Sequence, residues 1–275
     1  MSEIPEIIFI VPYRKREPQL EIMINHYTSL FDKQNYKIFV AHQNDKRFFN
    51  RGAMKNLGFL HAKECYPNNY LDILFIFNDV DILFGCRDET DIRTQKGFVK
   101  HYYGYKQTFG GIFSLYGRDF ERMNGFPNIW NWGYEDNCLR QRWKYINKTS
   151  MIDYSEFCDV TRNKIQQKYV IMTYICAGDR DEKVFNKHTT WNHYKLCCKN
   201  LLYDGLNKLY NVNKIQTTPS EDNVIIIDIN NFTTVLPHPE KAERKKLITR
   251  KDLQWDKSKT EPDPASATNR FFLMR

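Results

Sequence analysis

The segment LDILFIFNDVD (residues 71–81) decides the predicted fold. Residues 71–77 form an apolar run of the length of a buried strand, and the carboxylates Asp79 and Asp81 follow it with Val80 between them. In an open α/β sheet, ligands bind at the carboxyl ends of the strands. Carboxylate oxygens there can hold a hard divalent cation that keeps positions open for phosphate oxygens. The segment therefore predicts a strand that ends in a cation site, with a solvated strand end as the alternative.

The residues before this strand alternate between two kinds of periodicity. Apolar runs predict strands at 7–11 and 36–41, and helical patterns predict helices at 18–31 and 51–64. This alternation is typical of a parallel, nucleotide-binding sheet. Later the pattern is looser, with strands expected at 109–115, 168–175 and 223–228 and helices at 118–123 and about 136–145. We therefore predict an α/β fold with a mixed, Rossmann-like sheet whose N-terminal half binds a nucleotide.

The length of 275 residues and the apolar content of 41% suffice for one sizeable α/β domain. After about residue 238 apolar residues become scarce, while Pro, Lys and Glu increase. We expect a folded domain over residues 1–237 and an extended or disordered basic tail over 238–275.

The chain is basic, with a formal net charge of +8. Such a charge fits nucleic acid, an anionic membrane surface or an acidic small substrate. Charge alone does not choose between these partners, but a nucleic-acid-binding function ranks last among the functions considered, because the tail lacks aromatic interleaving and no recognition motif is present. A cleft for a diphosphate would also draw on Arg and Lys.

Two features bear on the compartment. No run approaches the ~20 apolar residues that a transmembrane helix needs, and the first apolar stretch ends at Pro12 without a basic region before it, unlike a secretion signal. The seven cysteines are irregularly spaced and include no Cys-x-x-Cys pair, which argues against a disulfide framework or a zinc site. We expect a cytoplasmic protein with reduced thiols and no transmembrane segment.

Two short segments are candidates for binding an anionic ligand. The loop PYRKR (12–16) follows the first strand, so Arg14 and Arg16 face the same sheet edge as the carboxylates after residue 78. Phe49 and Arg51 open the helix after the second strand, where a ring and a guanidinium can hold a base and a phosphate. The alternatives are a solvated basic turn and a core position for Phe49.

The loop NGFPNIWNWGYEDN (124–137) combines aromatic and acidic side chains. Trp130 and Trp132 lie outside any periodic element, and exposed indole rings on loops suit the faces of sugars. Glu135 and Asp136 follow at the start of a predicted helix, where the helix dipole favours ionised carboxylates. One of them, close to a substrate hydroxyl, can take its proton. The alternative is simple helix capping.

Together these segments resemble the β-1,4-galactosyltransferase family, whose catalytic domains have the GT-A fold. Six motifs occur in family order, namely VPYRKRE (11–17), FNRGAMKNLGF (49–59), FNDVDILF (77–84), FGGIFS (109–114), NGFPNIWNWGYEDN (124–137) and LYDGLNKLY (202–210). The resemblance implies a metal-dependent enzyme that moves a hexose or N-acetylhexosamine from a UDP-sugar to a glycan hydroxyl in one inverting displacement. A non-catalytic glycan- or nucleotide-sugar-binding module on the same fold is the alternative.

The resemblance also implies donor-binding roles. Pro12, Arg14 and Arg16 would contact the nucleotide. Phe49 would stack on uracil, and Arg51 would hold the donor nearby. Asp79 and Val80 would help to position the donor, and Trp132 would lie on a mobile loop that closes over it.

For the metal, the acceptor and the base, the resemblance implies a second set. Asp81 would bind Mn²⁺ together with a histidine, for which His188 is favoured and His193 is the alternative. The acceptor would contact residues of the 124–137 loop, with Asp136 as the catalytic base; these residues are Trp130, Tyr134, Glu135 and Asp136.

Two departures from the family pattern leave the substrates open. Tyr134 replaces the second glycine of Trp-Gly-Gly-Glu-Asp-Asp and Asn137 its last aspartate, which puts the acceptor in question. Thr108 stands where galactose-transferring relatives often have tyrosine, which leaves room for an N-acetyl group on the donor sugar. The membrane anchor and luminal disulfides of animal relatives are also missing from the sequence. This again suggests a cytosolic enzyme, bacterial or from a large DNA virus acting in the host cytoplasm.

Overall fold

The computed structural model describes residues 3–31, 35–84, 92–131, 133–147, 151–160, 169–171, 187–217, 223–236 and 238. Its strands are β1 (Ile7–Tyr13), β2 (Tyr36–Gln43), β3 (Leu74–Asn78), β4 (Ile82–Phe84), β5 (Val99–Gly104), β6 (Ile112–Tyr116), β7 (Ile152–Asp153), β8 (Cys158–Asp159), β9 (Tyr169–Ile171), β10 (Leu209–Thr217) and β11 (Val224–Thr234). Its helices are α1 (Glu17–Leu30), α2 (Arg51–Cys65), α3 (Gly117–Arg122), α4 (Glu135–Ile146) and α5 (Lys187–Lys199), with 3-10 turns η1 (Tyr70–Asp72) and η3 (Leu206–Lys208).

One mixed sheet organises the described residues. Its strand order is β10-β11-β2-β1-β3-β6-β5-β7, with β8 beside β5, while β4 and β9 pair separately. β1 lies parallel to β2 and β3, so that Ile10 is opposite Phe39 on one side and Phe77 on the other. β6 runs antiparallel to β3, and β11 lies parallel to β2 although it comes from the other end of the described chain. The predicted mixed α/β architecture is therefore confirmed.

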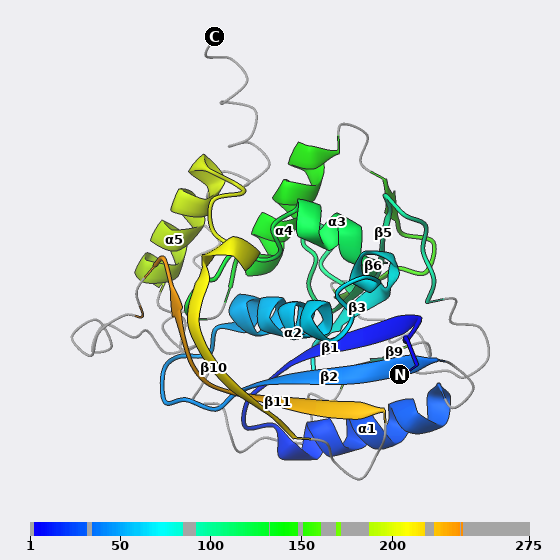
Figure 1. Ribbon diagram of the computed structural model, residues 1–275. Coiled ribbons are helices and arrows are strands. Elements are labelled where there is room, and N and C mark those ends of the chain that lie inside the picture. Colours follow the sequence, from blue (N-terminus) through cyan, green and yellow to red (C-terminus); the bar gives the residue numbers. More distant parts are fainter. Residues whose placement is uncertain are drawn as a thin grey trace.

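The central strands are buried on both faces because helices cover both. Every residue of β1 and β3 is buried. Alternate side chains point to opposite faces, so Ile8 and Ile10 pack with α2, while Ile7 and Phe9 pack with α1. Figure 1 shows α1 and α2 on opposite sides of β1 and β2. Such strands are continuous apolar runs, which made them recognisable in the sequence.

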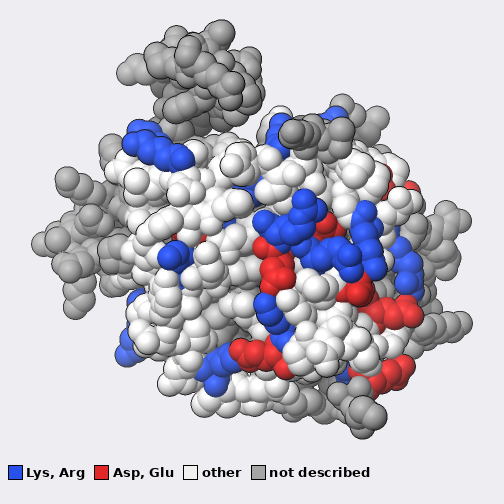
Figure 2. All heavy atoms as spheres, turned by 45° about the horizontal axis from the view of Figure 1, so that its top comes forward, with Lys and Arg blue, Asp and Glu red and all other residues white. Residues whose placement is uncertain are grey.

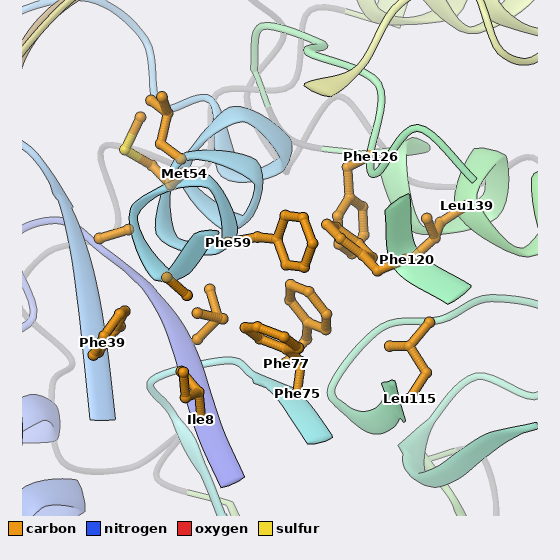
Figure 3. Close-up of a cluster of buried hydrophobic side chains, with 14 of the residues drawn as sticks. Ile8, Phe39, Met54, Phe59, Phe75, Phe77, Leu115, Phe120, Phe126 and Leu139 are labelled. Atoms are coloured by element: carbon orange, nitrogen blue, oxygen red, sulfur yellow. The ribbon is translucent and has the colours of Figure 1, made fainter. Parts of the chain in front are cut away.

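The core under α2 is largely aromatic. In Figure 3, Phe59 of α2 lies above Phe75 and Phe77 of β3, and Phe120 and Phe126 close the cluster on the other side. The rings of Phe59 and Phe75 are 4.9 Å apart and those of Phe77 and Phe120 are 4.4 Å apart. This packing fixes α2 against the end of β3. The first turn of α2 and the residues after β3 therefore keep a defined distance.

Most expected elements are present, with shifted ends. The four expected helices correspond to α1, α2, α3 and α4. The strand expected at 223–228 is the longer β11. Of the strand expected at 168–175, the described residues 169–171 form β9, which pairs with β4 outside the main sheet. The strands β4, β5, β7, β8 and β10 and the helix α5 were not anticipated. The predicted tail lies outside the described residues except for His238, so the domain boundary stays a prediction.

The surface of the described residues mixes both signs of charge. Lys63 lies 2.5 Å from Glu121, and Lys96 lies 2.6 Å from Asp72. Figure 2 shows basic and acidic side chains next to one another on one face of the molecule. The cysteines of the described part, Cys65, Cys138, Cys158, Cys197 and Cys198, are free thiols. None of the helices in this part is long and apolar enough to cross a membrane.

Candidate active site

A cavity of about 600 Å³ opens where β1 and β3 end. Its lining comes from the loop after β1, the start of α2, the turn after β3, the β5–β6 connection and the start of α4. The lining residues are Pro12, Arg14, Arg16, Phe48, Phe49, Arg51, Asp79, Val80, Asp81, Ile82, Tyr103, Gly104, Tyr105, Thr108, Gly110, Gly111, Asn131, Gly133, Tyr134, Asp136, Asn137 and Val160. The cavity therefore lies at the carboxyl edge of the parallel strands, as the sequence predicts.

Most of the predicted donor-binding residues line this cavity. Pro12, Arg14 and Arg16 come from the end of β1, and Phe49 and Arg51 from the start of α2. Asn50 caps α2, since its side chain accepts a hydrogen bond from the Ala53 N–H at 2.9 Å. The cap fixes the first turn of α2, and the residues on either side of Asn50, Phe49 and Arg51, line the cavity.

Arg47 fixes the loop that carries Phe49, a role that the sequence did not reveal. Its guanidinium lies between two rings, 4.7 Å from the centroid of Trp130 and 4.5 Å from that of Phe232. It also donates to the Phe232 carbonyl at 2.7 Å, and its own carbonyl accepts from Arg14. The end of β11 thus supports both predicted nucleotide-contacting segments.

The position of Trp130 differs from the one that the sequence predicts. We expected an exposed ring for the acceptor, but the side chain is only 1% exposed and does not line the cavity. Its ring stacks on Phe232 at 5.1 Å, and its Nε1–H donates to Thr234 Oγ1 at 3.0 Å. The indole is buried because it packs against Phe232 and the Arg47 guanidinium. Trp132 lies outside the described residues.

A buried cluster of charges lies beneath the cavity. The Arg51 guanidinium contacts three carboxylates, at 2.8 Å from Asp79 Oδ2, at 2.6 Å from Glu135 Oε1, and also at Asp136 Oδ2. Lys55, one helical turn after Arg51, is completely buried with its Nζ 3.1 Å from Asp79 Oδ1 and 3.8 Å from Asp136 Oδ1. The ends of β3 and α4 are therefore joined through two cations of α2.

Glu135 occupies a different place from the one expected. Its side chain is 2% exposed and is absent from the cavity lining, whereas Asp136 and Tyr134 on either side line it. The carboxylate faces inward because Arg51 holds it. As placed, Glu135 orients Arg51 and does not meet an acceptor.

The pKa values of the two cavity carboxylates in this cluster move in opposite directions. Burial raises the pKa of Asp136 to about 7, and the neighbouring charges of Glu135 and Asp79 add to the rise while Arg51 and Lys55 oppose it. Burial also disfavours the ionised form of Asp79, but Arg51 and Lys55 outweigh it and bring the pKa below the ordinary value. Asp136 can therefore hold or release a proton near neutral pH, while Asp79 stays ionised.

The residues that could hold a metal are only partly described. Asp81 lines the cavity from the turn after β3, and its carboxylate oxygens suit a hard cation. His193 of α5 is 9% exposed and absent from the cavity lining, and the side chain of His188 is outside the described part. Within the described residues, no group of three or more His, Cys, Asp and Glu is arranged to hold a metal ion. Asp81 fits a metal ligand, and its protein partner stays a prediction.

Sequence reasoning missed Lys55 and Arg47 for different reasons. The position of Lys55 beside Arg51 could have been predicted, because residues four apart lie on the same face of a helix. Arg47 could not, because both rings that hold it lie more than 80 residues further along the chain.

The sequence of the chain matches two protein-family models. Residues 3–91 match the family model for the N-terminal region of glycosyl transferase group 7, and residues 94–173 match that for the N-terminal domain of galactosyltransferase. Human β-1,4-galactosyltransferase 4 is 34% identical over 150 residues, which cover 50% of this chain and 42% of that protein. Human β-1,4-galactosyltransferase 2 is 35% identical over 151 residues, covering 50% and 39%. This chain thus spans less than half the length of these relatives in the match.

Solved structures share the fold over a longer part of the chain. The catalytic domain of Drosophila β-1,4-galactosyltransferase 7 with xylobiose superposes with a TM-score of 0.61 at 20% identity, covering 82% of this chain and 94% of that one. A mutant of the same enzyme in complex with manganese, UDP-Gal and xylobiose gives a TM-score of 0.55 at 19% identity, with the same coverage. At such identities the likeness establishes the architecture, and the residues of this chain must carry the chemistry.

Proposed function

Because the chain belongs to glycosyl transferase group 7, the family of the β-1,4-galactosyltransferases, we propose that it transfers a sugar from a UDP-sugar to a hydroxyl of a glycan acceptor. One observation carries the proposal. A single cavity is lined by Asp81 from the end of β3, by Asp136 from the start of α4 and by Arg14 and Arg16 from the end of β1. The arginines can bind the negatively charged diphosphate of a nucleotide, and the carboxylate of Asp136 can act as a base for an acceptor hydroxyl bound in the same cavity.

The donor side rests on a ring and two cations. Phe49 packs against the core under α2 with part of its side chain exposed to the cavity, which fits stacking on a uracil base. Arg14 and Arg16 line the same cavity, and their guanidinium groups suit phosphate oxygens. Binding of UDP-Gal by the Drosophila relative supports the same donor class here.

We propose Mn²⁺ as the cation, held by Asp81 and by His188. Manganese in the complex of the Drosophila relative supports this choice. When bound, the ion would supply positive charge beside the leaving diphosphate. Asp79 stays ionised after the end of β3, and its ion pair holds the Arg51 guanidinium in place.

Asp136 is the proposed base of an inverting displacement. The acceptor oxygen would bond to the anomeric carbon as the bond from that carbon to the phosphate oxygen breaks, and UDP would leave with the electron pair. The acceptor proton passes to the Asp136 carboxylate. A single displacement inverts the anomeric configuration. The pKa of about 7 suits this role, because the group is ionised in part at neutral pH and still accepts a proton.

We propose galactose or an N-acetylhexosamine as the donor sugar. Thr108 lines the cavity two residues before Gly110, whose backbone approaches Asp136 so closely that a Cβ there would lie 2.8 Å from Asp136 Oδ2. A threonine at this place leaves more space beside the sugar than a larger ring would. The size of the residue at 108 would then decide whether an N-acetyl group is accepted.

A panel of UDP-sugars tests the proposal. The full chain is incubated with each donor, with Mn²⁺ or with EDTA, and UDP release is followed with and without a panel of methyl pyranosides. We expect release from one or two donors in Mn²⁺ and none in EDTA. Asp136→Asn should keep UDP binding and lose transfer. His188→Ala should weaken the Mn²⁺ dependence more than the matched variant His193→Ala.

Two outcomes would oppose it. If no donor releases UDP, and UDP binds equally well in EDTA, the chain is a non-catalytic binding module on this fold. If Asp136→Asn transfers sugar at the wild-type rate, Asp136 is not the base.

A further inference from the structure

Tyr134 has an unusual backbone conformation next to the proposed base. It precedes Glu135 and Asp136 at the start of α4, with φ of 69° and ψ of −10°. This left-handed region favours glycine, and other residues adopt it at an energetic cost. The surrounding structure must therefore hold Tyr134 in place.

The contact that holds the Tyr134 ring comes from α5. The rings of Tyr134 and Tyr194 are stacked, with centroids 4.8 Å apart and planes at 25°. Tyr194 is 6% exposed, and its hydroxyl accepts a hydrogen bond from Gln141 Nε2 of α4 at 2.8 Å. Gln141 Oε1 accepts in turn from the Cys198 thiol at 3.2 Å. Tyr194 is thus fixed at both its ring and its hydroxyl.

This aromatic pair lies at the cavity, beside the base. Tyr134 lines the cavity together with Asp136 and Asn137, while Tyr194 lies behind it in the cluster between α4 and α5. A rigid, partly exposed ring offers an apolar face with a polar hydroxyl at its edge, which suits the C–H face of a pyranose.

Resting on the proposed function, we propose that Tyr134 is the wall against which the acceptor sugar packs and that Tyr194 is a positioning residue which acts through it. The acceptor is then a pyranoside that lies flat beside Asp136 and carries no substituent on the face toward Tyr134. The pair would select acceptors by shape, and the donor would be bound by Arg14, Arg16 and Phe49, which line the same cavity.

The test separates acceptor recognition from donor binding. For wild type and variants, the acceptor KM and kcat are measured with methyl β-D-xylopyranoside and methyl β-D-glucopyranoside, using the UDP-sugar preferred by wild type, and UDP affinity is measured by calorimetry in Mn²⁺. We expect Tyr134→Gly and Tyr194→Ala each to raise the acceptor KM at least tenfold, with UDP affinity changed less than twofold. Tyr134→Gly should remain folded, because glycine accepts the left-handed backbone.

Two further variants provide the matched controls. Tyr194→Phe keeps the stacked ring, so its acceptor KM should stay within about threefold of wild type, unlike that of Tyr194→Ala. Tyr145→Ala removes an exposed ring of α4 that does not line the cavity, so it should leave acceptor KM and kcat unchanged. Thermal unfolding of each variant checks that α5 remains packed on α4.

Several results would overturn the inference. An unchanged or lower acceptor KM in Tyr134→Gly would mean that the ring does not hold the acceptor. A rise in KM for Tyr134→Gly without one for Tyr194→Ala would remove the positioning role of Tyr194. If wild type hydrolyses a UDP-sugar but neither uses nor binds either pyranoside, the acceptor class is wrong. If wild type neither binds UDP nor hydrolyses any UDP-sugar, the proposed function itself fails.

Discussion

Lys55 Nζ lies 3.1 Å from Asp79 Oδ1 although the lysine side chain is completely buried. A buried ammonium needs opposite charge, because its transfer from water is costly. The cluster around it holds Arg51 as a second cation and three carboxylates, Asp79, Glu135 and Asp136. With all five groups ionised, one negative charge would be in excess. This excess and the burial of the cluster together favour a proton on Asp136.

Lys55→Met should therefore change both stability and pH dependence. Removal of one partner of a buried ion pair costs about 3–5 kcal/mol of unfolding free energy. Without Lys55 the pKa of Asp136 rises further, since Lys55 lowers it. The loss of stability should thus be larger at pH 8 than at pH 5.5, and urea unfolding at both values measures it. Lys63→Met, which breaks a half-exposed surface pair with Glu121, is the matched control and should cost less than about 1 kcal/mol. Equal losses for the two variants would contradict the buried charge balance.

The raised pKa of Asp136 predicts a pH dependence of definite sign. Between the ordinary pKa of 3.8 and the folded value of about 7, the folded chain binds the proton more tightly than the unfolded chain. The contribution of Asp136 to the free energy of unfolding therefore decreases by at most about 4 kcal/mol as pH rises through this range. Above this range the contribution is constant. Asp136→Asn lacks this loss, so its stability relative to wild type should increase from pH 4 to pH 7.

Asp72→Asn is the control for this sign. Hydrogen bonds from Lys96 lower the pKa of the exposed Asp72, with Arg118 contributing as well. Its contribution is present at neutral pH and is lost as pH falls, opposite to that of Asp136. Thermal unfolding of both variants and wild type from pH 2.5 to pH 8 distinguishes them, because the contribution of Asp72 is lost only below its ordinary pKa of 3.8. A relative stability of Asp136→Asn that does not depend on pH would refute the raised pKa.

Gly110→Ala should reduce transfer more than stability. A Cβ at this position would lie 2.8 Å from Asp136 Oδ2, and Arg51 restrains that carboxylate from moving away. A displacement of the base by a fraction of an ångström should lower kcat roughly 10–100-fold. Gly52→Ala is the comparison, because its Cβ would lie 2.3 Å from the Pro127 carbonyl oxygen, a backbone atom. We expect Gly52→Ala to lower the melting temperature strongly. A normal kcat in Gly110→Ala would show that Asp136 does not need its present position.

Arg47→Ala should weaken nucleotide binding with little effect on the chemical step. The variant loses the contacts with Trp130 and Phe232 and frees the loop that leads to Phe49. Each cation–π contact contributes roughly 0.5–2 kcal/mol. UDP affinity measured by calorimetry should fall about tenfold, while kcat at saturating donor stays near wild type. Arg93→Ala, which breaks an exposed pair with Glu6, is the control and should leave UDP affinity unchanged.

The fold could be predicted where local periodicity reflects burial. β1 and β3 are buried along their whole length and are therefore continuous apolar runs. β10 was missed because most of its residues are exposed, so it shows neither alternation nor an apolar run. α5 was missed because the face it presents to α4 includes Cys197 and Tyr194, which give a weak helical pattern.

The location of the site could be predicted from the residue types at the strand ends. Which side chains face the cavity and which are buried could not be predicted. Asp81, Asp136, Arg14 and Phe49 all line the cavity because the parallel strands bring their carboxyl ends together. Which of two adjacent carboxylates faces the cavity depends on Arg51, a contact between positions 84 residues apart. Trp130 shows the same limit, since a loop tryptophan looks exposed until Phe232 is placed on it.

The position of β11 has a consequence for how the chain reaches its folded state. This strand pairs in parallel with β2 across 186 positions of sequence, as in the contact between His42 and Asp228. Until the ribosome has released residues 224–234, β2 remains an open edge whose unpaired backbone groups can join other chains. A nascent chain that stops before β11 should aggregate in place of forming a smaller folded domain. Shortened versions of this protein should therefore be cut only after His238.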